Sequence, residues 1–300
     1  MRSKLAAMLA LLAVLATLLA APLRAAGNAA KPAVKDAFLT LPDGAKIHYL
    51  EAGQGSPIVL ITGWTIAADI WAKQIDHFAA SHRVVAFDPR SQGKSSKSGE
   101  GSFPGARAYD LDSILSQLGL APATLVCWSM AVTDCITYVD LYGSSKVSAL
   151  VLVDGYAGEP FDDKRTVGTL RFVAQLQRNR RALTDSFVRS MFKKPQSEEL
   201  LKHVIEASLE TPTDTAVALF VGTMEWDNSK ALAKIDKPVL LAVTESPFLE
   251  GYKKMHEQIR GSRLEVFQAG HALFVDEPEK FNQLVDGFLA SLKPQGAAGR

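Results

Sequence analysis

Short apolar runs alternate with helical stretches through most of this 300-residue chain. Strands that are apolar on both sides belong to a parallel sheet whose two faces are both covered by helices. The sequence therefore predicts an α/β fold. The predicted strands are PIVLIT (57–62), RVVAF (83–87), ATLVCW (123–128), VSALVLV (147–153), KPVLLAVT (237–244) and RLEVFQ (263–268). Helices are predicted near 70–80, 104–118, 130–142 and 278–292.

Two further strands precede these runs. The segment AFLTLPDGAKIHYLEAG alternates apolar and polar residues around Asp43 and Gly44, which is typical of a hairpin. With this hairpin, the sequence predicts an eight-stranded, mostly parallel sheet flanked by helices.

Residues 156–231 interrupt the alternation with several helical segments, such as SEELLKHVIEASL and TDTAVALFVGTM. The interruption follows the sixth predicted strand, and ligands bind at the carboxyl ends of strands in open α/β sheets. We therefore predict a helical lid over 156–231 between two parts of the core, 36–155 and 232–293. The alternative is a helical extension that packs elsewhere. Residues 294–300 are predicted to form a disordered tail.

The first 26 residues have the build of a secretory signal peptide. Arg2 and Lys4 precede an apolar run over 5–21, and small residues follow it. A membrane anchor is the alternative, because a spanning helix needs roughly 17–25 residues. Pro22 and the alanine-rich composition favour cleavage. The predicted location is therefore periplasmic or secreted.

Charge and motif spacing restrict the partners of the mature chain. Removing Arg2, Lys4 and Arg24 with the signal peptide takes the formal net charge from +1 to −2. A near-neutral chain has no electrostatic basis for binding nucleic acid or an anionic membrane. We expect a small-molecule substrate and leave the oligomeric state open. No residue cluster has metal-ligand spacing and no glycine-rich phosphate loop follows a strand, so neither a metal nor a cofactor is predicted.

The chain has two cysteines, Cys127 and Cys135. One lies at the end of a predicted strand and the other in the following helix. Elements that diverge from a sharp turn rarely bring their Cα atoms within the roughly 7 Å that a disulfide allows. We therefore predict two buried free thiols, although export implies an oxidising compartment.

The segment LVCWSMAVTDC places Ser129 between a predicted strand and a predicted helix. A sharp turn at such a position lifts a nucleophile above the sheet, and the next backbone N–H, of Met130, can bind an oxyanion. Small residues are needed two positions before and after the nucleophile, where Cys127 and Ala131 stand. The motif by itself leaves open a buried structural serine.

Two other predicted strand ends could supply partners for Ser129. His271 follows the last predicted strand in the loop VFQAGHALFVDEPEKF. A general base in this position reaches a serine at the same edge of the sheet. The segment LITGW ends the first parallel strand, and its Gly63 allows a tight turn that directs the N–H of Trp64 at the same oxyanion.

Several motifs in this order resemble those of the α/β-hydrolase fold superfamily, over residues 37–292. They are TGW for the oxyanion turn, DPRSQGKS for a glycine-containing loop, CWSMA for the nucleophile turn, LVLVDG for the next strand, and AGHALFVDEPEKF for the histidine loop and final helix. The pattern looks most like the cofactor-free haloperoxidase and esterase group. Departures from the pattern are Thr62 for His and Ser91, Cys127 and Ala131 for Gly. Asp88 and Arg90 of the second motif are expected to form an internal charge pair.

The resemblance leaves the position of the triad acid open. The family usually places an aspartate just after the strand at 237–244, where this chain has Ser246 with Glu245 beside it. Some members carry the acid one strand earlier, where this chain has Asp154. We predict that Asp154 orients His271. Glu245 and the lack of a working acid are the alternatives.

The resemblance implies an exported serine hydrolase that cleaves an ester, thioester or lactone of a small apolar substrate. Catalysis would use Ser129, His271 and Asp154. The expected substrate-binding side chains are Trp64, Trp128, Met130, Phe187, Phe192 and Phe220. Two alternatives stay open: a cofactor-free perhydrolase or haloperoxidase that uses the same triad, and a non-catalytic binding protein on a hydrolase scaffold.

Overall fold

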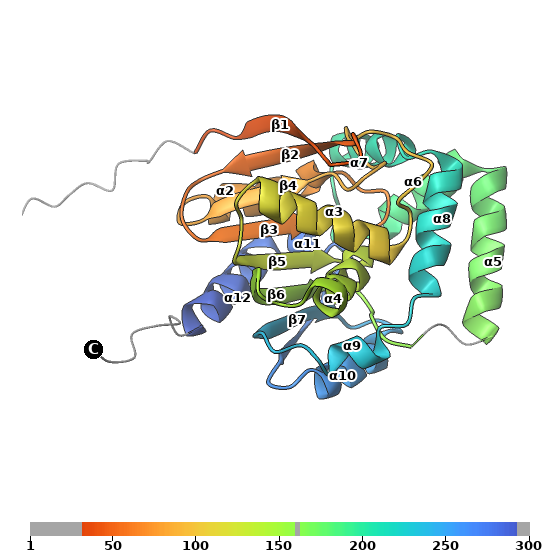
Figure 1. Cartoon of the computed structure of the whole chain (residues 1–300). Coiled ribbons are helices and arrows are strands. Elements are labelled where there is room, and N and C mark those ends of the chain that lie inside the picture. The colour runs from red at the N-terminus through yellow and green to blue at the C-terminus, as the bar shows by residue number, and fades with distance from the viewer. Residues whose placement is uncertain (1–31, 160–162, 293–300) are drawn as a thin grey trace, which may run out of the picture. The chain divides into compact units, whose positions relative to one another are not determined.

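An eight-stranded sheet forms the centre of the fold, with its strands in the order β1-β2-β4-β3-β5-β6-β7-β8 (Figure 1). The computed structural model describes residues 32–159 and 163–292, so the predicted signal peptide and tail lie outside the described residues. The first two strands pair antiparallel, β2 runs antiparallel to β4, and the other neighbours are parallel. The predicted eight-stranded, mostly parallel sheet is confirmed. The strands are β1 Lys35–Thr40, β2 Lys46–Ala52, β3 Pro57–Ile61, β4 Arg83–Phe87, β5 Ala123–Trp128, β6 Val147–Val153, β7 Val239–Thr244 and β8 Arg263–Phe267.

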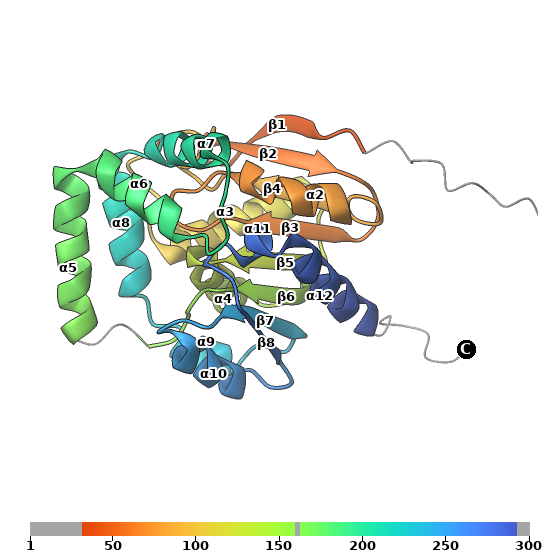
Figure 2. The same cartoon turned by 180° about the vertical axis from the view of Figure 1, so that it is seen from behind.

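Helices cover both faces of this sheet, as its apolar strands require. One face carries α3 (Pro104–Gln117), α4 (Met130–Tyr142), α9 (Ser229–Leu232) and α10 (Leu249–Gln258). The other carries η1 (Ala68–Trp71), α2 (Ala72–Phe78), α11 (Leu273–Asp276) and α12 (Pro278–Ser291), as the view from behind shows (Figure 2). Within residues 32–159 and 163–292, no helix is both long and apolar enough to cross a bilayer.

The two faces have separate hydrophobic cores, because successive side chains of a strand point to opposite sides. In β5, Leu125 and Cys127 belong to the core beneath α3 and α4. Val126 and Trp128 belong to the core beneath α2, α11 and α12. This alternation fixes which side of the sheet each residue near Ser129 can reach.

The segment between β6 and β7 is helical and ends with α9. Before α9 come α5 (Asp163–Arg178), α6 (Arg180–Ser190), α7 (Glu198–Leu209) and α8 (Thr213–Met224). We call these four helices the helical insertion. A local sequence signal starts α7 within this insertion. The Ser197 side chain accepts a hydrogen bond from the backbone N–H of Leu200 and caps the helix. The insertion lies beyond the carboxyl ends of the parallel strands (Figure 1).

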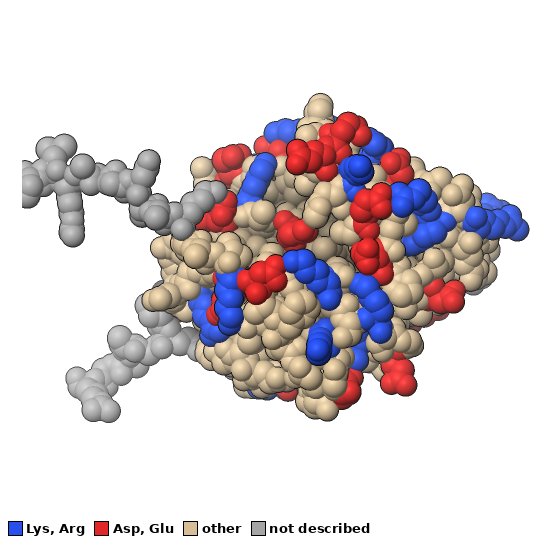
Figure 3. Space-filling view, turned by 90° about the horizontal axis from the view of Figure 1, so that it is seen from above, with Lys and Arg blue, Asp and Glu red and all other residues tan. Residues whose placement is uncertain are grey.

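Charged side chains of both signs are interspersed over the face seen from above (Figure 3). Several exposed charged side chains of the insertion form ion pairs with one another. Arg189 contacts both Asp185 and Glu198, and Arg181 contacts Glu206. Such exposed pairs contribute little to stability, because water and salt screen their charges.

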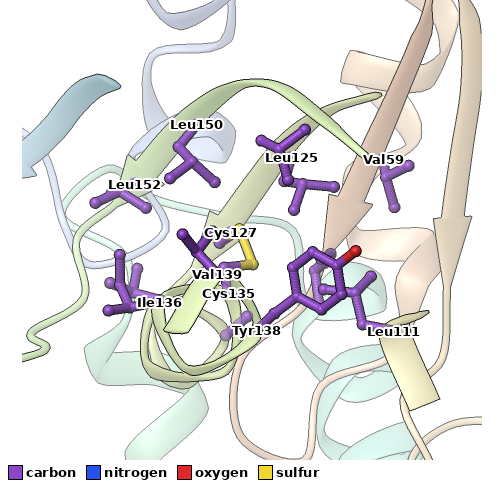
Figure 4. Close-up of a cluster of buried hydrophobic side chains, with 14 of the residues drawn as sticks. Val59, Leu111, Leu125, Cys127, Cys135, Ile136, Tyr138, Val139, Leu150 and Leu152 are labelled. Atoms are coloured by element: carbon purple, nitrogen blue, oxygen red, sulfur yellow. A yellow bond between two sulfur atoms is a disulfide. The ribbon is translucent and has the colours of Figure 1, made fainter. Parts of the chain in front are cut away.

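The two cysteines form a disulfide, which corrects the prediction of free thiols (Figure 4). The Cα atoms of Cys127 and Cys135 are 6.6 Å apart, within the range that a disulfide accepts. The prediction was wrong because α4 does not diverge from β5 at this level. The second turn of α4 instead packs back against the strand, so both residues lie in the same buried core.

Removing this disulfide is expected to destabilise the fold. The bond closes a loop with a sequence separation of 8, and the chain-entropy relation for a loop of this length gives about 2.5 kcal/mol. We expect the Cys127→Ala/Cys135→Ala variant to lose about this much free energy of unfolding in urea titrations. The wild-type protein, denatured without reductant, should show no titratable thiols. Two free thiols there would contradict the disulfide.

Residues 88–96 form a loop. The predicted charge pair between Asp88 and Arg90 is not formed there, because each side chain has other partners. Asp88 instead accepts hydrogen bonds from the backbone N–H groups of Ala68 and Lys94 and contacts His48. Arg90 is buried and donates to Asp110 on α3 with two nitrogens. The prediction of a mutual pair was wrong, because the side chain of Arg90 reaches α3 while that of Asp88 reaches β2 and η1.

His48 ties this loop to the two N-terminal strands. Its Nδ1 is 2.8 Å from Asp88 Oδ2 and its Nε2 is 2.9 Å from Asp36 Oδ1. Burial lowers the pKa of His48, but hydrogen bonds and charge interactions with Asp88 and Asp36 outweigh burial and raise this pKa above its ordinary value of 6.5. The charged imidazolium therefore stabilises the folded state.

This raised pKa predicts a pH-dependent cost for His48→Gln. The pKa of His48 is higher in the folded state than in the unfolded state. The charged ring therefore adds to the free energy of unfolding. This contribution is fully present below the unfolded-state pKa and is lost as pH rises through the folded-state pKa. The variant should therefore lose more free energy of unfolding at pH 5.5 than at pH 9, as measured by urea titration. His82→Gln is the control, because the His82 ring contacts the hydroxyl of Ser81 rather than a carboxylate. An equal cost of His48→Gln at both pH values would contradict the prediction.

Candidate active site

Ser129 occupies a sharp turn between β5 and α4. Its backbone has φ 58° and ψ −120°, a conformation that costs free energy for a residue with a Cβ. The turn is crowded by the neighbouring strand ends: a Cβ on residue 63 would lie 2.8 Å from the Cβ of Ser129, and one on residue 155 would lie 2.2 Å from its carbonyl oxygen. Glycine at both positions lets Gly63 and Gly155 approach the serine. The sequence analysis did not single out Gly155.

Ser129, His271 and Asp154 form a continuous line of hydrogen bonds. His271 Nε2 is 2.9 Å from Ser129 Oγ, and His271 Nδ1 is 2.7 Å from Asp154 Oδ2. Asp154 is buried, while the His271 side chain is 29% exposed. The three residues follow β5, β6 and β8, which end at the same edge of the sheet. The structure therefore brings together the three residues of the predicted triad.

The alternative acid, Glu245, has a different partner. Its carboxylate accepts a hydrogen bond from Gln268, and its side chain is exposed. The imidazole of His271 contacts Asp154 instead. The geometry thus supports the acid position after β6.

Two residues that were not predicted from the sequence form hydrogen bonds to the predicted triad or to the loop beside it. Thr244 donates to Asp154 Oδ1 from its backbone nitrogen at 2.7 Å and from its hydroxyl at 2.8 Å. Asp276 accepts a hydrogen bond from the backbone N–H of Gly270, beside His271. The sequence signal for Asp276 is a carboxylate within the apolar run ALFVD, which must find partners when it is buried.

The predicted oxyanion donors lie on either side of Ser129. Trp64 is the residue after Gly63. Met130 is the first residue of α4, so the backbone N–H of Met130 has no acceptor within that helix. Among the described residues, no acceptor is assigned to either N–H. Gln92 fixes the turn after Gly63, because its amide accepts from Thr65 and donates to the carbonyl oxygens of Gly63 and Ile66. The sequence analysis did not identify Gln92, whose signal is a polar side chain in the loop after β4.

A cavity of about 600 Å³ opens beside the triad. The helical insertion supplies much of its wall. Aromatic rings gather around Trp64, whose ring centroid lies 5.2–5.7 Å from those of Phe172, Phe187 and Phe220. The lining includes Ser129, Asp154 and His271 with Trp64, Met130, Phe172, Phe187, Met191, Phe220, Met224 and Trp226.

Two of the residues expected to bind substrate lie elsewhere. Trp128 is 1% exposed, packs against Phe274 and donates its indole N–H to the carbonyl oxygen of His271. Its expected substrate contact was wrong, because alternation along β5 directs the ring to the face under α11 and α12. Phe192 packs against that same core rather than the cavity. The other four expected residues, Trp64, Met130, Phe187 and Phe220, do line the cavity.

Tyr252 of α10 is a buried phenol that interacts with Asp154. Its side chain is 3% exposed. Burial raises the pKa of this phenol, and the charge of Asp154 and a hydrogen bond to it raise the pKa further. Tyr252 therefore stays a neutral donor next to the carboxylate. No group of three or more potential metal ligands occurs among the residues that the structure describes.

Comparisons with known proteins identify the class. The sequence profile of the alpha/beta hydrolase family matches residues 58–284, and the chain belongs to this family. It is 28% identical over 263 residues to a putative non-heme chloroperoxidase from Synechocystis, covering 81% of this chain and 94% of that protein. It is 26% identical over 282 residues to a bifunctional esterase/perhydrolase from Acinetobacter calcoaceticus, covering 85% and 99%. An esterase from Exiguobacterium antarcticum superposes with a TM-score of 0.80 at 27% identity, covering 86% of this chain and 100% of the esterase. The protein is thus an α/β-hydrolase enzyme near the haloperoxidase and esterase group.

Proposed function

We propose that the protein is an exported serine hydrolase that cleaves an ester, thioester or lactone bond of a small apolar substrate. The observation that carries this proposal is the hydrogen-bonded line from Ser129 through His271 to Asp154, which opens into an aromatic-lined cavity. The likeness to an esterase from Exiguobacterium antarcticum also supports this proposal.

The geometry supports a two-step acyl transfer. His271 Nε2 takes the proton from Ser129 Oγ as the oxygen attacks the substrate carbonyl carbon. The backbone N–H groups of Trp64 and Met130 stabilise the negative charge on the carbonyl oxygen, and one such donor is worth on the order of 10²–10³ in rate. The tetrahedral intermediate expels the alcohol or thiol, which takes the proton from His271. Water then attacks the acyl-enzyme, with His271 again accepting the proton. The second tetrahedral intermediate breaks the bond between the acyl carbon and Ser129 Oγ, which takes the proton back from His271 as the carboxylic acid leaves. Asp154 balances the imidazolium charge throughout.

The cavity supports a small apolar substrate. A volume of about 600 Å³ suits a small molecule, and pockets of this size bind mainly through apolar contacts. The rings of Phe187 and Phe220 meet that of Trp64 next to the proposed oxyanion donor. In this proposal the helical insertion is the lid that forms the outer wall of the substrate cavity.

Two features support export. The first 26 residues have the composition of a signal peptide. The disulfide between Cys127 and Cys135 is of the kind that persists in oxidising compartments and is rare in the cytosol. Fractionation of cells that express the full chain tests this part of the proposal, since a mature protein found only in the cytosol would contradict it.

A fluorophosphonate probe tests the proposed nucleophile directly. Such a probe reacts covalently with a serine only when a neighbouring base activates it. We expect one label per wild-type protein, located on the peptide that contains Ser129, and none on Ser129→Ala. A folded wild-type protein that neither takes the label nor hydrolyses p-nitrophenyl esters would overturn the proposal.

Perhydrolysis is a second candidate, favoured by the likeness to a bifunctional esterase/perhydrolase. In this reaction hydrogen peroxide replaces water as the nucleophile that attacks the acyl-enzyme. The attack releases a peracid and regenerates the Ser129 hydroxyl. The peracid then oxidises a halide. Measuring ester hydrolysis and peroxide-dependent halogenation on one preparation separates the two activities. Halogenation well above the background of acid plus peroxide would support the second candidate.

A further inference from the structure

The carboxylate of Asp154 is held at both of its oxygens. Oδ2 is 2.7 Å from His271 Nδ1, while Oδ1 receives the backbone nitrogen of Thr244 at 2.7 Å and the hydroxyl of Thr244 at 2.8 Å. Asp154 is 4% exposed and Thr244 is 3% exposed. A carboxylate held in this way cannot turn about its Cβ–Cγ bond without breaking hydrogen bonds in a buried site, which is costly.

The sheet register explains why Thr244 occupies this place. Strands β6 and β7 are parallel neighbours, with Val153 beside Ala242. The backbone N–H of Asp154 continues this ladder, because it donates to the carbonyl oxygen of Ala242 at 2.9 Å. Continued by one residue, this register pairs residue 154 with residue 243, so the last residue of β7, Thr244, lies one position further on and within reach of the Asp154 side chain. Any residue except proline at position 244 would supply the backbone donor, but the second donor requires a hydroxyl.

Asp154 itself has an unusual backbone conformation, with φ 41°. Residues with a Cβ rarely adopt this region, and the surrounding contacts must compensate for its cost. The hydroxyl of Thr244 is one of these contacts, together with the backbone donor of the same residue.

We infer that the hydroxyl of Thr244 is a positioning group for the triad: it fixes the rotation of the Asp154 carboxylate, so that Oδ2 faces His271. This inference rests on the proposed hydrolase function. Thr244 makes no hydrogen bond to Ser129 or His271, so its only hydrogen bonds to the triad are those to Asp154.

Thr244→Val tests the inference, because valine keeps the branched shape and the backbone N–H and removes only the hydroxyl. We expect kcat for p-nitrophenyl butyrate to fall about 10- to 100-fold, the factor that corresponds to one lost hydrogen bond to a charged group. The KM should change less than about 2-fold, because uniform substrate binding is not altered. Thr244→Ser restores the hydroxyl and should recover most of the wild-type kcat.

A double-mutant cycle separates positioning from a merely structural role. If Thr244 acts through the Asp154 carboxylate, Thr244→Val should cost little further activity in the Asp154→Asn background. The same fold-loss in both backgrounds would overturn the inference. So would an unchanged kcat in Thr244→Val, or a failure of Thr244→Ser to recover activity.

A matched control measures the general effect of removing a buried hydroxyl. Thr124, at the opposite end of β5, is 5% exposed and its hydroxyl contacts that of Ser148 at 3.1 Å. Thr124→Val should leave kcat within about 2-fold of wild type, and the melting temperatures of both variants should be recorded. An inactive wild-type protein would contradict the proposed function, whereas an active wild type with an equally active Thr244→Val contradicts only this inference.

Discussion

Replacing Ser129 by alanine is expected to lower kcat for ester hydrolysis by at least on the order of 10⁴-fold. The substitution removes the only atom of the triad that forms a bond to the acyl group. It leaves His271, Asp154 and the two backbone donors in place, so that a small residual rate above the uncatalysed reaction should remain. The expected measurement is steady-state turnover of p-nitrophenyl butyrate.

The Ser129→Ala protein should fold as the wild type does, because alanine fits wherever serine does. Its melting temperature should therefore lie close to that of the wild type. Ser291→Ala, in the last turn of α12, is the matched control for loss of a hydroxyl and should keep full activity. Turnover by Ser129→Ala near that of the wild type would mean that another residue is the nucleophile.

Asp154→Asn is the second large effect that we expect, with a fall in kcat on the order of 10⁴-fold. The amide keeps the shape of the side chain but cannot balance the charge of the His271 imidazolium. An amide can also present a donor to Nδ1 and so favour the wrong tautomer of His271. The KM should change little, because Asp154 acts on the transition state rather than on uniform substrate binding.

Glu245→Gln is the control that distinguishes the two acids. Glu245 is exposed and bonded to Gln268, so its neutral isostere should retain nearly all activity. The reverse result, a large loss in Glu245→Gln with an active Asp154→Asn, would move the acid to the end of β7. Equal and small losses in both variants would mean that His271 works without a carboxylate partner.

Much of the fold follows from local sequence. Continuous apolar runs that alternate with helices predicted the eight-stranded sheet and both covered faces, because burial of apolar strands requires helices on each side. The strand-to-helix turn at Ser129 and the loop of His271 were also recognisable, because each is defined by residues that are close in sequence.

Two errors around Ser129 have different causes. Trp128 is next to Ser129 in sequence, yet its ring lies on the other face of the sheet. That error came from treating nearness in sequence as nearness in space. Cys127 and Cys135 were expected to separate, but the packing of α4 along β5 brings their Cα atoms to 6.6 Å. That error came from assuming that a strand and the helix after it diverge from the turn.

The sequence by itself determined the class of fold, the serine and the histidine, and the edge of the sheet where they meet. Only the tertiary structure showed that His271 contacts Asp154 and not Glu245, and it alone revealed Thr244 as a partner of Asp154. The physical reason is the pairing of strands. The β6–β7 register brings the side chain of residue 154 within hydrogen-bond distance of residue 244, and the two residues are 90 positions apart in the chain. Such a juxtaposition depends on how the strands align, and no local pattern of residues encodes it.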